Sequence, residues 1–127
     1  MHGLISQVVL IGDRRPFLTA IVTLDPESAP GWAQEHGIEG DLAAIAADER
    51  THKEIELAIE EVNAQFAKVE GIKKFRVLER DFLQEKNEIT PTLKVKRNKI
   101  GEGYGAVINE MYEADSPAYG VARAKND

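Results

Sequence analysis

One long amphipathic helix limits the folds open to this chain more than any other feature of its sequence. Thr51 and Glu54 have the spacing of a capping box, in which two side chains satisfy backbone N–H groups at a helix N-terminus. Beyond them, apolar residues recur at intervals of four and three, as on one face of an α-helix: Ile55, Ile59, Val62, Phe66 and Val69. We therefore expect a helix from Thr51 to Glu70, ended by Gly71, whose apolar face packs on another layer.

Three segments have the composition of β-strands. Ile5 to Ile11 and Phe17 to Leu24 are apolar runs, and the residues between them, 12–16, read GDRRP, which is typical of a turn. An antiparallel hairpin is predicted, and the nearly continuous apolar character of its first strand indicates a central strand or one covered on both faces. Lys73 to Arg80 places β-preferring residues between charges, which predicts a third strand with one wet face.

The remaining segments favour helices. Ser28 and Pro30 mark a helix start that His36-Gly37 ends, and Asp41 is placed to cap a second helix over Leu42 to Ala47. A rough apolar stripe predicts a helix between Val95 and Tyr112, and the tail from Ala114 has no periodic pattern and is expected to fray. This order predicts an α+β fold, with helices packed on a small, mostly antiparallel sheet.

Composition excludes several classes of function. The chain has 127 residues, a net charge of −6 and no cysteine. The length suits one domain with a single core, and the acidic balance argues against a general nucleic-acid-binding protein. Without cysteine, the chain has no disulfide scaffold, thiolate zinc site or Cys nucleophile. No signal peptide and no apolar run of about 20 residues are evident, so we expect a cytoplasmic protein with no transmembrane segment.

Common catalytic patterns are missing from the sequence. The histidines are scattered and lack metal-ligand spacing, so no metal site is predicted; they are His2, His36 and His52. No serine lies in a G-x-S-x-G context, which argues against serine hydrolysis. The glycine-rich run from Gly101 to Gly105 lacks the spacing of a phosphate-binding loop and fits a helix start or a flexible joint better.

One segment stands out because it gathers four cations within six positions of an otherwise acidic chain: Lys94, Lys96, Arg97 and Lys99. Pro91 interrupts regular structure there and favours a loop that projects Lys94. The surrounding stretch, NEITPTLKVKRNKI, resembles the C-terminal signature of the AMP-forming acyl-CoA synthetases in their long-chain fatty acid ligase branch. Two further blocks, ISQVVLIGDRRPFLTAIVTLD and VNAQFAKVEGIKKFRVLERDF, resemble the same branch in the same order.

The resemblance covers about residues 4 to 113 and implies a domain organisation. Residues 1–113 would form the small C-terminal domain of a much longer ligase, followed by a flexible tail over 114–127. The implied partner is an N-terminal ligase domain in the same chain. The implied substrates are a fatty acid, ATP and coenzyme A, with Mg²⁺ expected in the full-length enzyme. The resemblance leaves room for peripheral membrane contact by that enzyme.

The resemblance also implies roles for named residues. Matching the K-x-x-R of the signature places the family's catalytic lysine at Lys94, accompanied by Arg97, with Lys96 as the rival for the lysine's role. Coenzyme A would contact a second segment, over Lys73, Lys74 and Phe75. By this account the isolated domain is inactive.

Two other classes of function remain open at this stage. The chain could be a freestanding α+β binding module, whose KVKRNK cluster contacts RNA or another phosphate-bearing or acidic partner. It could also be a purely structural partner domain. The acidic balance of the chain disfavours the first of these, because a nucleic-acid-binding surface needs a basic excess.

Overall fold

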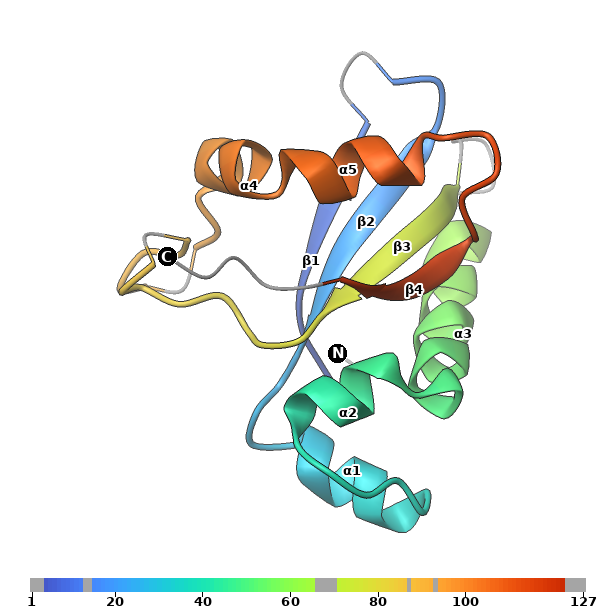
Figure 1. Ribbon diagram of the computed structural model, residues 1–127, viewed down its shortest axis with the longest axis vertical. Helices are drawn as coiled ribbons and strands as arrows, with labels where there is room; N and C mark the ends of the chain where they lie inside the picture. Colours follow the sequence, from blue (N-terminus) through green and yellow to red (C-terminus); the bar gives the residue numbers. More distant parts are fainter. Residues whose placement is uncertain (1–3, 13–14, 66–70, 87, 93, 123–127) are drawn as a thin grey trace.

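The computed structural model describes residues 4–12, 15–65, 71–86, 88–92 and 94–122. Its strands are β1 (Ile5–Ile11), β2 (Leu18–Leu24), β3 (Ile72–Leu78) and β4 (Tyr119–Ala122). Its helices are α1 (Ala29–Glu35), α2 (Leu42–Ala47), α3 (Glu49–Gln65), α4 (Arg97–Gly103) and α5 (Gly105–Met111). The α+β class is confirmed, and Figure 1 shows the strands side by side with helices around them.

The sheet is mixed, so the expectation of a mostly antiparallel sheet is wrong. The strands lie in the order β1-β2-β3-β4. The β1–β2 pair is the predicted antiparallel hairpin, whereas β2–β3 and β3–β4 are parallel. The chain passes through α1, α2 and α3 between β2 and β3, and a helical crossover of this kind returns the chain in the same direction.

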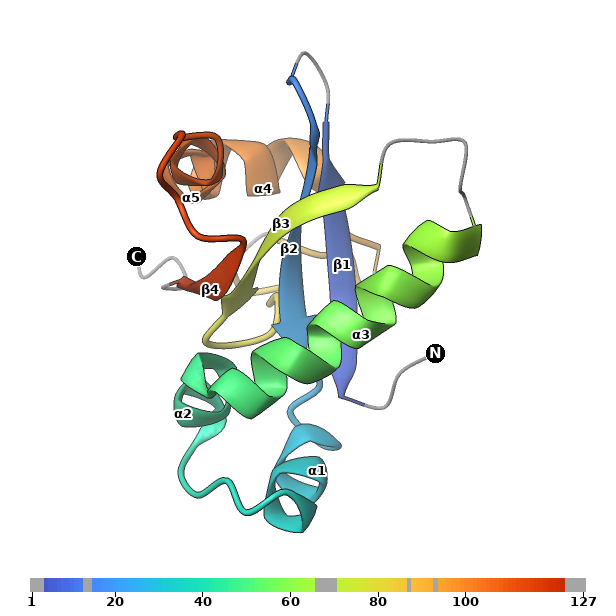
Figure 2. The same cartoon turned by 90° about the vertical axis from the view of Figure 1, so that its right-hand side faces the viewer.

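Helices cover both faces of the sheet, and each face has its own apolar cluster. The side chains of β2 alternate between them: Ala20 and Val22 face α1–α3, whereas Ile21 faces α4 and α5. Figure 2 shows α3 crossing one face, with α4 and α5 beyond the sheet on the other. The internal strands are therefore β2 and β3. Strand β1 lies at an edge with Val8 and Leu10 exposed, so the prediction that it is central or covered on both faces is wrong.

Covering both faces also explains why β3 lacks the predicted wet face. Phe75 and Val77 join the cluster beneath α1–α3, and Leu78 joins the one beneath α4 and α5. The charged residue between them, Arg76, is buried at 2% exposure. Strand β4 extends the sheet beyond β3, within the segment where no element was predicted.

The long helix is confirmed, but it begins two residues before the predicted cap. Asp48 precedes the first turn and its Oδ1 accepts the Arg50 N–H at 2.8 Å, so Asp48 rather than Thr51 caps α3. Thr51 lies inside the helix, fully buried. Ile55 and Ile59 are buried as the stripe predicts, whereas Phe66 and Val69 lie outside the described residues.

The shorter helices follow their local signals. The Asp41 side chain accepts the Ala44 N–H at 3.0 Å and caps α2, as predicted. Ser28 holds the N-cap position of α1, but its hydroxyl bonds Asp25 and caps no backbone N–H. The predicted C-terminal helix is divided at Tyr104 into α4 and α5, within the glycine-rich run.

Candidate functional site

The basic segment forms a loop between β3 and α4, which we call the Lys94 loop (residues 88–92 and 94–96). Ile89 and Val95 pair across it in an isolated antiparallel bridge. Thr90 holds Lys94 from both sides, because the Thr90 N–H donates to the Lys94 carbonyl (2.9 Å) and the Lys94 N–H donates to the Thr90 hydroxyl (3.0 Å). The backbone of Lys94 is therefore fixed in a loop, as the sequence predicts.

The two candidate lysines differ in their surroundings. Lys94 is exposed, and its ammonium makes no hydrogen bond or ion pair with any residue that the structure describes. Lys96 is half-buried, precedes the first turn of α4, and donates its N–H to the Glu88 carbonyl at 2.9 Å. Lys94 is thus the more exposed of the two lysines.

Arg97 joins the loop to the sheet. It is the first residue of α4, and its guanidinium donates to the backbone carbonyl of Leu10 on the edge strand β1. An exposed arginine that bonds a carbonyl keeps its charge, since a carbonyl does not neutralise it. Arg97 therefore fixes the start of α4 and adds a cation beside the loop.

A buried ionic network holds the base of the Lys94 loop. Glu88 is 3% exposed, and its carboxylate accepts from Arg80 (2.7 Å), from the Tyr104 hydroxyl (2.6 Å) and from the Leu83 N–H (3.0 Å). Burial by itself would raise the pKa of Glu88, but these hydrogen bonds and the Arg80 charge hold that pKa below its usual value. The hydrogen bond to Glu88 raises the pKa of Arg80 in turn. Glu88 therefore remains ionised, and its bonds fix the base of the Lys94 loop.

The residues predicted to contact coenzyme A lie near the start of β3, which β2 separates from β1 in the sheet. Lys73 is exposed, whereas the Lys74 ammonium donates to the carbonyls of Glu113 (3.2 Å) and Ser116 (3.1 Å). Phe75 is 4% exposed, and its ring stacks on Tyr119 of β4 at 5.6 Å. Phe75 would thus support this segment from within the core rather than touch a ligand.

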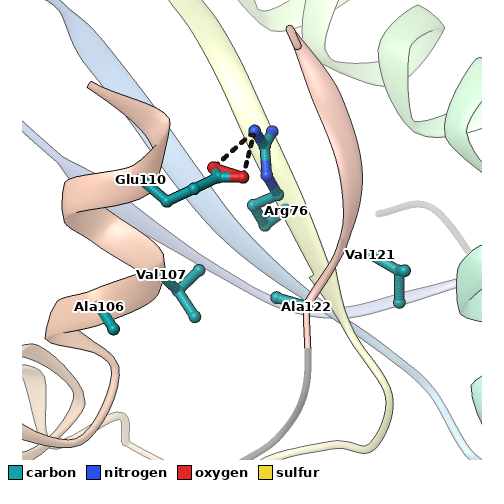
Figure 3. A pocket seen from close by; sticks show the side chains of 6 residues that line it. All are labelled: Arg76, Ala106, Val107, Glu110, Val121 and Ala122. Atoms are coloured by element: carbon teal, nitrogen blue, oxygen red, sulfur yellow. Dashed lines mark hydrogen bonds and ion pairs between the residues drawn. The ribbon is translucent and has the colours of Figure 1, made fainter. Parts of the chain in front are cut away.

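A second charged group lies at a pocket between α5 and β4. Figure 3 shows Arg76 and Glu110 pointing toward one another, with Val107 and Val121 among the apolar lining. The pocket has a volume of about 280 Å³. The Arg76 guanidinium bonds the Glu110 carboxylate (2.9 Å) and the Pro117 carbonyl (3.0 Å), so it joins β3 to α5 and to the chain entering β4.

The histidines and the glycine-rich run considered in the sequence have structural roles. His52 is buried, and its Nε2 lies 2.7 Å from the Ala46 carbonyl; His36 Nδ1 lies 2.8 Å from the Trp32 carbonyl. Gly101 to Gly105 lie in α4 and its junction with α5 rather than in a loop that follows a strand. In the described ranges, no three His, Asp or Glu side chains gather as a metal site requires, and no helix has the length and hydropathy of a membrane span.

Sequence reasoning missed two ion pairs that each have one buried partner, Arg76 in one and Glu88 in the other. Arg80 and Glu88 are eight residues apart in a polar stretch, and Arg76 and Glu110 lie on different elements. Charges in such positions usually face solvent, so their sequence pattern gives no signal of burial. Tertiary structure, which these local patterns do not contain, buries Arg76 and Glu88.

Comparison of the sequence with known proteins identifies a family and several relatives. The family model described as "AMP-binding enzyme C-terminal domain" matches residues 1–116. The long-chain-fatty-acid–CoA ligase FadD15 of Mycobacterium tuberculosis is 37% identical over 116 residues, covering 90% of this chain and 19% of the relative. Human long-chain-fatty-acid–CoA ligase 6 is 35% identical over 115 residues, covering 85% of this chain and 16% of the relative.

The match therefore concerns one part of each relative. The chain spans about a sixth to a fifth of the length of these ligases. No solved structure matches significantly. The family model covers nearly all of the described sheet and helices, from β1 to α5 and both ends of the Lys94 loop. This chain belongs to the family of AMP-binding enzyme C-terminal domains, as the resemblance of its basic segment predicted.

Proposed function

We propose that this chain is the mobile C-terminal domain of an ATP-dependent long-chain fatty-acid–CoA ligase, and that Lys94 acts in acyl-adenylate formation. The observation that carries the proposal is the presentation of Lys94. Its backbone is held on both sides by Thr90, while its exposed ammonium has no partner in the described part of the chain. A lysine placed in this way has a fixed backbone position and an ammonium group that is available to a ligand.

The first half-reaction suits such a cation. A carboxylate oxygen of the fatty acid attacks the α-phosphorus of ATP, an acyl–phosphate bond forms, and the bond to pyrophosphate breaks. The ammonium of Lys94 would lie between the carboxylate and the α-phosphate, where it reduces their repulsion and stabilises the charge that develops on the phosphoryl oxygens. A point charge on a flexible stem can follow these atoms through the step.

Arg97 would support the same step from the start of α4. Its guanidinium is bonded to a neutral carbonyl, so the positive charge remains available to the anions near Lys94. Mg²⁺ is expected to accompany ATP in the full-length enzyme. We assign it no ligand here, because the described residues contain no group of three or more metal-binding side chains.

In the second half-reaction, the thiolate of coenzyme A attacks the acyl carbon, a thioester forms and AMP leaves. The domain would turn between the two steps and present a different surface. Lys73 is the exposed cation at the start of β3, and Lys74 lies beside it with its ammonium already bonded to backbone carbonyls. We propose Lys73 as the contact to coenzyme A phosphates, with Lys74 and Phe75 fixing the strand end. The whole enzyme would work in the cytoplasm.

A domain exchange tests this proposal. The C-terminal part of the mycobacterial relative would be replaced by residues 1–122 of this chain, and the formation of acyl-CoA from palmitate, ATP and coenzyme A would be measured. The expected result is acyl-CoA synthesis by the chimera and none by the same ligase without a C-terminal domain. A control chimera carrying Lys94→Ala tests for the contribution of the loop. A well-folded chimera that is no more active than the truncated ligase would contradict the proposal.

A further inference from the structure

We propose that Glu88 is a positioning residue for Lys94, acting through Arg80 and Tyr104; this inference rests on the proposed role of Lys94 in adenylate formation. Glu88 does not contact Lys94. It fixes the base of the loop, so that the Lys94 backbone has one position relative to the sheet and to α4.

Two separate parts of the chain converge on the Glu88 carboxylate: the segment that follows β3, and the junction of α4 with α5. Arg80 comes just after β3 and makes a two-pronged contact, with its Nη1 at 2.7 Å from Oε1 and its Nη2 at 3.2 Å from Oε2. Tyr104 divides α4 from α5 and donates its hydroxyl at 2.6 Å. The Leu83 N–H donates at 3.0 Å from the segment that follows β3. The side chain is 3% exposed, so few water molecules compete for these bonds.

The backbone of Glu88 bonds both the segment before the Lys94 loop and the far end of the loop. Its N–H donates to the Leu83 carbonyl at 3.1 Å, and its carbonyl accepts from the Lys96 N–H at 2.9 Å. The next residues inward are the bridged pair Ile89 and Val95, and then Thr90 with its two bonds to Lys94. Backbone pairing therefore runs from Glu88, whose carboxylate is fixed by its own partners, to Lys94.

Burying an ionised group at this place carries a desolvation cost that an apolar side chain would avoid. A buried carboxylate loses its hydration, and an apolar side chain of similar size would pack at less expense. The carboxylate instead fixes orientation, because the two-pronged contact to Arg80 and the Tyr104 hydroxyl hold it from two sides. Since a shift of about 1 Å in a catalytic group can lower a rate by roughly a hundredfold, this orientation matters for Lys94.

The test measures each half-reaction in a ligase that carries this domain. Tyr104→Phe removes the hydroxyl that donates to Glu88 (2.6 Å) and accepts a longer bond from Arg80 (3.5 Å). Glu88→Leu removes the carboxylate, and Glu88→Gln keeps an acceptor oxygen for Arg80. We expect Tyr104→Phe to lower kcat for adenylation about 10-fold and Glu88→Leu about 100-fold, with Glu88→Gln closer to the parent. The KM for ATP and for the fatty acid, and the rate of thioester formation from supplied acyl-adenylate, should change less than about threefold.

A matched control separates positioning from simple loss of stability. Ile45→Ala removes a buried side chain on the other face of the sheet, so it should lower the Tm without changing either half-reaction. If the Glu88 and Tyr104 variants lower both half-reactions equally, or behave like Ile45→Ala, the positioning role is wrong. Lys94→Ala is measured alongside them. If it abolishes adenylation while the other variants do not affect it, the proposed function stands and this inference falls; if it leaves adenylation intact, both fall.

Discussion

The ion pair between Arg76 and Glu110 allows a quantitative prediction, because its two partners differ in exposure. The Arg76 side chain is 3% exposed and the Glu110 side chain is 48% exposed. Figure 3 shows Arg76 on β3 and Glu110 on α5 pointing toward one another, both at the lining of the pocket. Removing one partner therefore has a different consequence from removing the other.

The magnitudes follow from what each variant leaves behind. Arg76→Met keeps an unbranched apolar stem in the core and releases Glu110 to water, so the loss is that of charge-assisted hydrogen bonds, about 1 to 2 kcal/mol. Glu110→Ala leaves a buried guanidinium without a carboxylate. Breaking a fully buried pair costs about 3 to 5 kcal/mol. Because Glu110 is half-exposed, and because Arg76 keeps its bonds to Ser116, Pro117 and Phe75, we expect about 2 to 4 kcal/mol here.

Urea unfolding of the 127-residue chain, followed by circular dichroism, measures both values. The free energy of unfolding should fall further for Glu110→Ala than for Arg76→Met. The double variant should resemble Arg76→Met, since a carboxylate that has lost its cation contributes little. If Arg76→Met proves the more damaging of the two, desolvation of the arginine does not govern this pair and the reasoning is refuted.

Three further predictions concern other residues. Thr51 Oγ1 is buried without a hydrogen-bond partner in the described part of the chain, so Thr51→Val should raise the free energy of unfolding by about 1 kcal/mol in a thermal or urea titration, and a loss would show that the hydroxyl is bonded. Because the pKa of Glu88 is lower in the folded state, its stabilising contribution is complete above its unfolded pKa of about 4.3 and is lost as the pH falls through the folded pKa. Glu88→Gln should therefore flatten the acid limb of a stability–pH profile, and an unchanged limb would contradict this. The isolated chain should show no palmitate-dependent ATP–pyrophosphate exchange; robust exchange would mean that it holds a complete active site.

Local signals predicted most elements of the fold. The stripe containing Ile55 and Ile59 predicted α3, and the apolar runs around the turn predicted β1 and β2. The cap of α3 was misplaced because Asp48 and Thr51 are both good caps, and only Asp48 precedes the first turn. Strand β4 was missed because it has only four residues, too few to show the alternating pattern of a strand. It is held at the edge of the sheet by pairing with β3.

Strand direction and burial depended on tertiary structure. The parallel pairing of β2 and β3 follows from the helical crossover between them, which the element order contained but the composition of the strands did not reveal. In the candidate site, Lys94 was proposed from the family's K-x-x-R signature, with Lys96 as the rival, and its loop was predicted from Pro91. Glu88 could not be proposed in this way, because its partners Arg80 and Tyr104 come from other parts of the chain.

The measurement that tests the central claim most directly compares Lys94→Ala with Lys96→Ala in a ligase carrying this domain. Each variant is assayed for the single-turnover rate of acyl-adenylate formation and, separately, for thioester formation from supplied acyl-adenylate. We expect Lys94→Ala to lower the first rate by about 10² to 10³ and to spare the second, because its cation acts where charge develops on the phosphoryl group. Lys96→Ala should affect neither. If Lys96→Ala alone abolishes adenylation, the catalytic role belongs to Lys96; if neither variant changes adenylation more than a few-fold, the proposed function of the loop is contradicted.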